Sequence, residues 1–217
     1  MTKKDRYKAF IAYFSENMKN AETELHYSNP YQLLVAVILS AQCTDKRINQ
    51  ITPALFNAYP EPELVAKASI ADVFPFIRSV SYPNNKTKNI IGMARTLVGE
   101  FKGIVPATVG ELVKMPGVGR KTANVIASVI YNQPTMAVDT HVFRVSKRLG
   151  LVAISATTPL AVEKELVANI ADKFIPYAHH WLILHGRYVC VARSPKCSIC
   201  QITQFCKYFE RKMVLQK

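Results

Sequence analysis

The feature that most restricts the fold of this chain is the spacing of its proline and glycine residues. They interrupt the sequence at helix-length intervals, and no segment between them alternates apolar and polar residues as a surface strand would. The boundary at Asn29-Pro30 is typical, because a capping residue followed by proline starts a helix. The pattern therefore predicts an all-α protein.

The expected helices cover most of the chain. They are residues 3–17, 31–39, 44–59, 61–67, 70–79, 84–101, 108–114, 120–131, 140–149, 158–170 and 177–190. The longest apolar run is residues 33–39, which is far shorter than the roughly 20 residues that span a bilayer, so we expect no membrane insertion. A hydrophobic content of 49% in 217 residues is ample for the core of one large or two small domains.

The charge of the chain indicates a polyanionic partner. Lys and Arg number 28 against 15 Asp and Glu, which gives a formal net charge of +13 and an isoelectric point near 9.6. Such a balance favours nucleic acid or an anionic membrane surface. The opening segment, residues 1–10, carries charges and lacks the apolar stretch of a secretory peptide. We therefore expect a cytoplasmic protein with reduced thiols.

Four of the five cysteines gather near the C-terminus, in the order C-x6-C-x2-C-x5-C. They are Cys190, Cys197, Cys200 and Cys206. Structural zinc usually takes two short cysteine pairs, whereas this loop has one short pair between two single cysteines. Four thiolates round a loop suit an iron–sulfur cluster, although zinc and four metal-free buried thiols remain alternatives. The fifth, Cys43, is interpreted as a core or pocket-wall residue.

The segment 108–131, TVGELVKMPGVGRKTANVIASVIY, predicts a second functional feature. Two helical stretches flank a glycine-containing turn, in which backbone amides can approach a ligand closely. Together with the start of the following helix, such amides can hold a phosphate. An ordinary packing hairpin is the alternative. The candidate DNA contacts here are Pro116, Gly117, Val118, Gly119 and Arg120.

The chain resembles the helix-hairpin-helix DNA glycosylases, and within them the endonuclease III family. The matching segments are LLVAVILSAQCTD at 33–45, LVKMPGVGRKTANV at 112–125, VDTHVFRVSKRLGL at 138–151, and the loop from Cys190 to Cys206. The resemblance implies a two-lobed all-α fold whose cysteine loop carries one 4Fe-4S cluster. It also implies base-excision repair, in which a bifunctional enzyme removes oxidised pyrimidines from double-stranded DNA and cleaves abasic sites as an AP lyase.

Two residues align with the catalytic pair of that family. Lys121 matches the nucleophilic lysine, and its place at a helix N-terminus favours the neutral amine. A phosphate-binding lysine is the alternative. Asp139 matches the catalytic aspartate, and it is also a candidate N-cap of the next helix, which is worth about 1 kcal/mol.

The resemblance implies further contacts with DNA. Gln42 matches the glutamine that fills the gap left by a flipped base, and Tyr82 is a candidate for the opposing wedge; a helix-terminal polar residue is the alternative for Gln42. Ser40, Asp45 and His141 are candidate pocket residues, with a structural role the alternative for His141. The cluster is expected to hold a basic loop containing Arg187, Arg193 and Lys196 against phosphates.

The expected domains are residues 23–133, a central helical domain, and residues 1–22 with 134–217, a discontinuous cluster domain. A monomer acting at the bacterial nucleoid is expected. Adenine-mismatch and thymine-mismatch glycosylases are rivals within the superfamily, although they usually lack a lysine at position 121. Rivals from other classes are a non-catalytic hairpin module and a zinc-dependent transcription factor.

Overall fold

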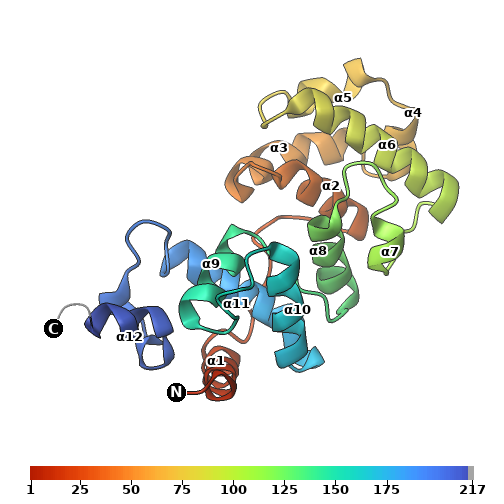
Figure 1. Cartoon of the computed structure of the whole chain (residues 1–217). Coiled ribbons are helices and arrows are strands. Elements are labelled where there is room, and N and C mark those ends of the chain that lie inside the picture. Colours follow the sequence, from red (N-terminus) through yellow and green to blue (C-terminus); the bar gives the residue numbers. More distant parts are fainter. Residues whose placement is uncertain (215–217) are drawn as a thin grey trace. The chain divides into compact units, whose positions relative to one another are not determined.

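The computed structural model describes residues 1–214, and all of the regular structure in this range is helical (Figure 1). The prediction of an all-α protein is confirmed. No helix in the described range is long and apolar enough to cross a membrane. The chain divides into two compact units: unit 1 comprises Met1–Thr23 and Asn132–Lys217, and unit 2 comprises Glu24–Tyr131.

Unit 2 is a group of helices around one strongly apolar helix, α2. Its helices are α2 (Pro30–Ser40), α3 (Asp45–Ala58), α4 (Pro62–Lys67), α5 (Ile70–Ile77), α6 (Pro83–Phe101), α7 (Val109–Leu112) and α8 (Arg120–Tyr131). The Asn29 side chain caps α2 by accepting a hydrogen bond from the backbone of Gln32, 2.9 Å away. Because residues 33–39 are all buried, α2 is covered on every side, as expected for a helix that is apolar all round.

The longest helix of unit 2, α6, packs against α2, α4 and α5. Its apolar residues Ile90, Met93, Ala94 and Leu97 recur at helical spacing and are fully buried. Lys86 lies one turn before Ile90 and is also buried, at 5% exposure. The inward face of α6 therefore begins with a charged residue.

Unit 1 is built from both ends of the chain. Its elements are α1 (Lys3–Asn17), α9 (Thr140–Leu149), α10 (Pro159–Asn169), η1 (Asp172–Phe174), α11 (Ile175–Tyr188), η2 (Cys197–Ile199), η3 (Thr203–Phe205) and α12 (Lys207–Val214). The core is aromatic: the Trp181 ring lies 5.8 Å from the rings of both Phe10 and Phe14, centroid to centroid. The Trp181 indole N–H donates to the carbonyl of Met18 at 2.8 Å. These contacts fix α1 against α11.

The structure differs from the expected helices at two places near the cysteines. Helix α11 ends at Tyr188, so Cys190 follows the helix instead of lying in its last turn. The backbone N–H of Cys190 bonds back to the carbonyl of His185 at 2.7 Å, which closes the helix there. Helix α12 was not among the expected helices.

Candidate functional site

The predicted hairpin is present between α7 and α8. Its turn is exposed at Pro116, Gly117 and Gly119, while Val118 is buried at 5% exposure and anchors the turn to the core of unit 2. The backbone N–H of Val118 donates to the carbonyl of Met115 at 3.1 Å. The turn therefore exposes its backbone, while the buried side chain of Val118 anchors it to unit 2.

The two glycines of the hairpin have different roles. Gly117 has a φ of +79°, and a Cβ there would lie 2.7 Å from the Cβ of Asn89, so only glycine fits. Gly119 lacks a positive φ, and a Cβ there would meet nothing within 4 Å. The tight turn thus needs Gly117 alone. At Gly119 the missing side chain leaves open space beside the start of α8.

Lys121 and Asp139 each lie in the first turn of a helix or just before it. Lys121 is the second residue of α8 and its side chain is exposed, in unit 2. Asp139 is the N-cap of α9 in unit 1, and its Oδ1 accepts hydrogen bonds from the backbone of His141 and Val142, both at 2.8 Å. The capping role weighed for Asp139 is therefore confirmed, and it occupies one carboxylate oxygen.

Gln42 and Tyr82 are brought together in unit 2, although they are far apart in sequence. Gln42 follows the end of α2, Tyr82 precedes α6, and each has a φ of 55°, in the left-handed region. Both side chains are exposed, Tyr82 at 63%. The Ser81 hydroxyl donates to the carbonyl of Gln42 at 2.7 Å, which joins the two loops.

The neighbouring candidates Ser40 and Asp45 take local positions. The Ser40 hydroxyl bonds back within α2 to the carbonyl of Val37 at 2.9 Å. Asp45 is the first residue of α3, which is capped by the Thr44 side chain. Cys43 lies half-buried against the core of unit 2, in keeping with the core interpretation.

The four-cysteine loop lies in unit 1, and its four thiols are half-buried and form no disulfide. Cys190, Cys200 and Cys206 pack against the core of the unit. Among residues 1–214, no three His, Cys, Asp or Glu side chains gather closely enough to hold a single metal ion. A four-iron cluster makes a different demand, because each of its four cysteines bonds a separate iron.

The electrostatics of this loop fit an iron–sulfur cluster. Burial raises the pKa of the Cys200 and Cys206 thiols, backbone hydrogen bonds from the residues that follow them partly oppose this rise, and the charges of the other cysteines of the loop add to it. Metal ligation requires the thiolate form. A positively charged centre bonded to the sulfurs compensates for their burial and their mutual repulsion. The donor set and its surroundings thus suit a bound cluster, and the deprotonated thiols would be stabilised by it.

Two arginines that the sequence analysis did not single out hold the start of the cysteine loop. The Arg148 guanidinium donates to the carbonyls of Val191 and Ala192, both at 2.7 Å, and lies 3.4 Å from the Cys190 sulfur. Arg144 donates to the carbonyl of Cys190 at 3.0 Å and contacts the ring of His141 at 3.1 Å. The contact favours the structural role for His141. Arg144 and Arg148 lie four residues apart, so the sequence places them on one face of the helix, which is the signal that could have indicated a shared role.

The other basic candidates of the loop are positioned by unit 1. Arg193 and Lys196 are exposed, and Arg187 is half-buried in the last turn of α11. Three further histidines of α11 are buried: His179, His180 and His185. Burial and the neighbouring His179 lower the pKa of His180 to about 3, and burial lowers that of His185 to about 4. They are core residues.

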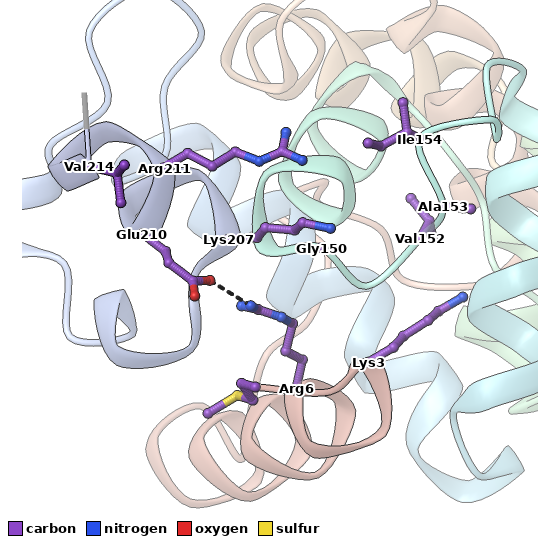
Figure 2. A pocket seen from close by; sticks show the side chains of 11 residues that line it. Lys3, Arg6, Gly150, Val152, Ala153, Ile154, Lys207, Glu210, Arg211 and Val214 are labelled. Carbon is purple, nitrogen blue, oxygen red and sulfur yellow. Dashed lines mark hydrogen bonds and ion pairs between the residues drawn. The ribbon is translucent and has the colours of Figure 1, made fainter.

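A hollow of about 750 Å³ in unit 1 contains none of the candidate site residues (Figure 2). Figure 2 shows Lys207 and Arg211 extending from α12 across it, while Arg6 meets the carboxylate of Glu210 at 2.7 Å. Gly150 lines the same hollow with a φ of 77°, and a Cβ there would lie 2.9 Å from the Lys207 side chain. These contacts attach α12 to the rest of unit 1 directly after Cys206.

This chain is similar to known DNA repair enzymes along most of its length. A family model described as HhH-GPD superfamily base excision DNA repair protein matches residues 35–171, and the iron-sulfur binding domain of endonuclease III matches residues 190–206. Endonuclease III of Rickettsia prowazekii is 50% identical over 196 residues, 90% of this chain and 92% of the relative. Endonuclease III of Escherichia coli K12 is 40% identical, with the same coverage. The chain belongs to the endonuclease III family.

Solved structures agree with this assignment. A chain described as part of a non-covalent endonuclease III–DNA complex matches with a TM-score of 0.91 and 39% identity, covering 99% of this chain and 100% of that one. A thermostable thymine-DNA glycosylase matches with a TM-score of 0.86 at 20% identity, which shows a shared fold alone.

Membership settles the class of protein. The chain is a base-excision DNA repair enzyme, a DNA glycosylase and AP lyase that acts on damaged DNA and binds one 4Fe-4S cluster. The predicted family, fold class, activity and cofactor are confirmed. The non-catalytic module, the zinc-dependent transcription factor and the mismatch glycosylases are not favoured.

Proposed function

We propose that this enzyme excises oxidised pyrimidines through Lys121, whose amine forms a Schiff base with the damaged nucleotide. The observation that carries the assignment is the place of Lys121, exposed in the first turn of α8 and directly after the hairpin turn. Phosphates held by the turn and by the start of α8 would bring the deoxyribose to this amine. No other lysine lies in the turn or in the first turn of α8.

Asp139 is proposed as the acid–base partner of Lys121. Its Oδ1 caps α9, and its Oδ2 makes no hydrogen bond within residues 1–214. One oxygen therefore fixes the carboxylate while the other is left to accept a proton or to stabilise positive charge on the sugar. The N-cap bond and the catalytic role are compatible in one residue.

The reaction follows from these two groups. The target nucleotide is flipped out of the duplex. The Lys121 nitrogen attacks C1′ as the glycosidic bond breaks, the base leaves with the bonding electrons and takes up a proton, and the amine loses a proton toward Asp139. Ring opening gives an imine. Loss of a C2′ proton then breaks the C3′–O bond, the 3′ phosphate leaves, and water hydrolyses the imine to release Lys121.

The remaining candidates are proposed to bind DNA. Gln42 and Tyr82 would fill the gap left by the flipped nucleotide, since both are exposed and lie on adjoining loops. The hairpin amides and Arg120 would hold phosphates on one side. The cysteine loop would be ligated to the cluster through Cys190, Cys197, Cys200 and Cys206, and would present Arg193 and Lys196 to the backbone. The cluster supplies a rigid support for this loop.

Domain arrangement and location complete the proposal. A central helical domain at residues 23–133 and a cluster domain from the remainder would bind the duplex together. The bacterial sources of the relatives support action on chromosomal DNA in the cytoplasm.

Borohydride trapping on an abasic duplex tests the nucleophile. Wild-type protein is expected to form a covalent DNA adduct, and Lys121→Ala to form none while still binding the duplex. Lys67→Ala, an exposed lysine at the end of α4, serves as the matched control and should trap normally. Undiminished trapping by Lys121→Ala would assign the chemistry to another amine.

A further inference from the structure

Lys86 is a buried lysine that the mechanism above does not use. It lies in the first turn of α6 and is 5% exposed. Its ammonium group donates to the carbonyl of Leu39 at 2.7 Å and to that of Ala41 at 2.6 Å. These carbonyls belong to the C-terminal end of α2, where a helix has no backbone partners of its own. Lys86 thus caps α2 from another helix, immediately before Gln42.

The setting of Lys86 is unusual for a lysine with a purely stabilising role. It makes no ion pair within residues 1–214. Burial lowers its pKa, which the nearby Cys43 partly opposes. A buried cation is costly unless it is hydrogen-bonded, and an apolar side chain of similar length would avoid that cost but leave the two carbonyls without this donor. What only the ammonium provides is the fixed position of two carbonyls.

Those carbonyls precede a strained segment. Gln42 and Tyr82 both have a φ of 55°, a conformation that costs energy for residues with a side chain. The Ser81 hydroxyl holds the Gln42 carbonyl at 2.7 Å. Lys86 therefore binds the carbonyls of Leu39 and Ala41, just before Gln42, and Ser81 binds the carbonyl of Gln42 itself. Ser81 directly precedes Tyr82 in the sequence, and Lys86 follows it by one helical turn.

We propose that Lys86 and Ser81 are positioning residues that lock the loops of Gln42 and Tyr82 into one preformed wedge. The inference rests on the proposed function, because it takes these two side chains as the pair that replaces the flipped nucleotide. A wedge that is already ordered enters the base stack without a further loss of conformational entropy. This lock, formed by Lys86 and Ser81, affects the opening of the duplex and leaves the chemistry of Lys121 unchanged.

The lock predicts a selective kinetic defect. In Ser81→Ala and Lys86→Met, single-turnover excision of thymine glycol from a paired duplex should fall roughly tenfold, as expected for lost hydrogen bonds to a strained loop. Trapping at a preformed abasic site, which has no base to unstack, should stay within about twofold of wild type. A fluorescent base analogue opposite the lesion should report slower or weaker unstacking in the same variants.

A double-mutant cycle separates positioning from general weakening of the fold. In a background of Gln42→Ala with Tyr82→Ala, where no wedge side chains remain, Ser81→Ala and Lys86→Met should cause less than about twofold further loss. Lys88→Met, an exposed lysine two residues along α6, is the matched control for removal of charge. Ser81→Ala retains the test if Lys86→Met proves unstable.

Two results would overturn the lock: excision within twofold of wild type in folded Ser81→Ala and Lys86→Met, or an equal loss with and without the wedge side chains. Failure of the proposed function looks different. It would appear as trapping that persists in Lys121→Ala, whatever the behaviour of the loop variants.

Discussion

The two units hold their candidate DNA-binding loops by different means. In unit 2 the loops of Gln42, Tyr82 and the hairpin are fixed by groups of the polypeptide itself: the Lys86 ammonium, the Ser81 hydroxyl and the left-handed Gly117. In unit 1 the segment from Cys190 to Cys206 contains only two short 3-10 turns, and its four thiols form no disulfide. Groups of the polypeptide fix the loops of unit 2, and we expect the cysteine loop of unit 1 to depend on its cluster as well.

Arginines of unit 1 hold both ends of the cysteine loop. Arg144 and Arg148 bind carbonyls of residues 190–192, and Arg6 binds the carbonyl of Phe205. Both ends of the loop are thereby anchored. Between these anchors the backbone N–H of Lys196 donates to the carbonyl of Val189 at 3.0 Å, and we expect the cluster to provide the further support of Arg193 and Lys196.

Removing the iron should produce the largest difference between the two units. After anaerobic chelation, amides in residues 190–206 are expected to lose protection from hydrogen exchange by at least about a hundredfold, because the ligated loop loses its cross-links. Amides of residues 39–43 should change by less than about threefold. Equal loss of protection in both loops would show that the cluster supports the whole molecule instead of one loop.

Arg148→Ala should weaken the anchored end of the cysteine loop by a smaller amount. It leaves the carbonyls of Val191 and Ala192 without their charged donor, which should lower the free energy of unfolding by about 2–3 kcal/mol. Urea unfolding measures the loss, and visible absorbance should show faster loss of the cluster. Arg211→Ala, an exposed arginine on α12, is the control. Cluster loss at the wild-type rate would contradict the anchoring role.

Local signals predicted the parts of this fold that depend on neighbouring residues. The helices α1, α8 and α9 have the expected bounds, because caps such as Asp139 and turns such as Gly150 act within a few residues. The cysteine spacing and the hairpin motif were informative for the same reason. The sequence alone therefore located both functional segments and most helices.

Contacts between distant segments were missed. Lys86 reads as a surface lysine until α2 is placed beside α6, since its partners are carbonyls 45 and 47 residues away. Arg148 likewise finds its carbonyl partners more than 40 residues later in the chain. Backbone carbonyls carry no signature of their own in a sequence. Residues that position a loop are consequently harder to predict than those that perform the chemistry.

Gly117→Ala should test whether the hairpin of unit 2 is fixed by its backbone. Alanine at a φ of +79°, with Asn89 2.7 Å away, should destabilise the protein by about 2 kcal/mol. Gly119→Ala is the matched control, because its Cβ enters open space, and its unfolding free energy should stay within about 0.5 kcal/mol of wild type. Its affinity for duplex DNA should fall nonetheless. Equal destabilisation by the two changes would contradict the distinction.

The smallest expected effect lies in the core of unit 1, at His180. Its pKa is about 3 in the folded protein, against about 6.5 for an unfolded chain, so acid favours the unfolded state as pH falls below 6.5. Between pH 7.5 and pH 5.5 this residue alone should remove about 1.4 kcal/mol of stability. Urea unfolding of His180→Gln should be less sensitive to pH than wild type by that amount, since the cluster and His185 remain in both. The same pH dependence in folded His180→Gln and in wild type would place the acid sensitivity at groups other than His180.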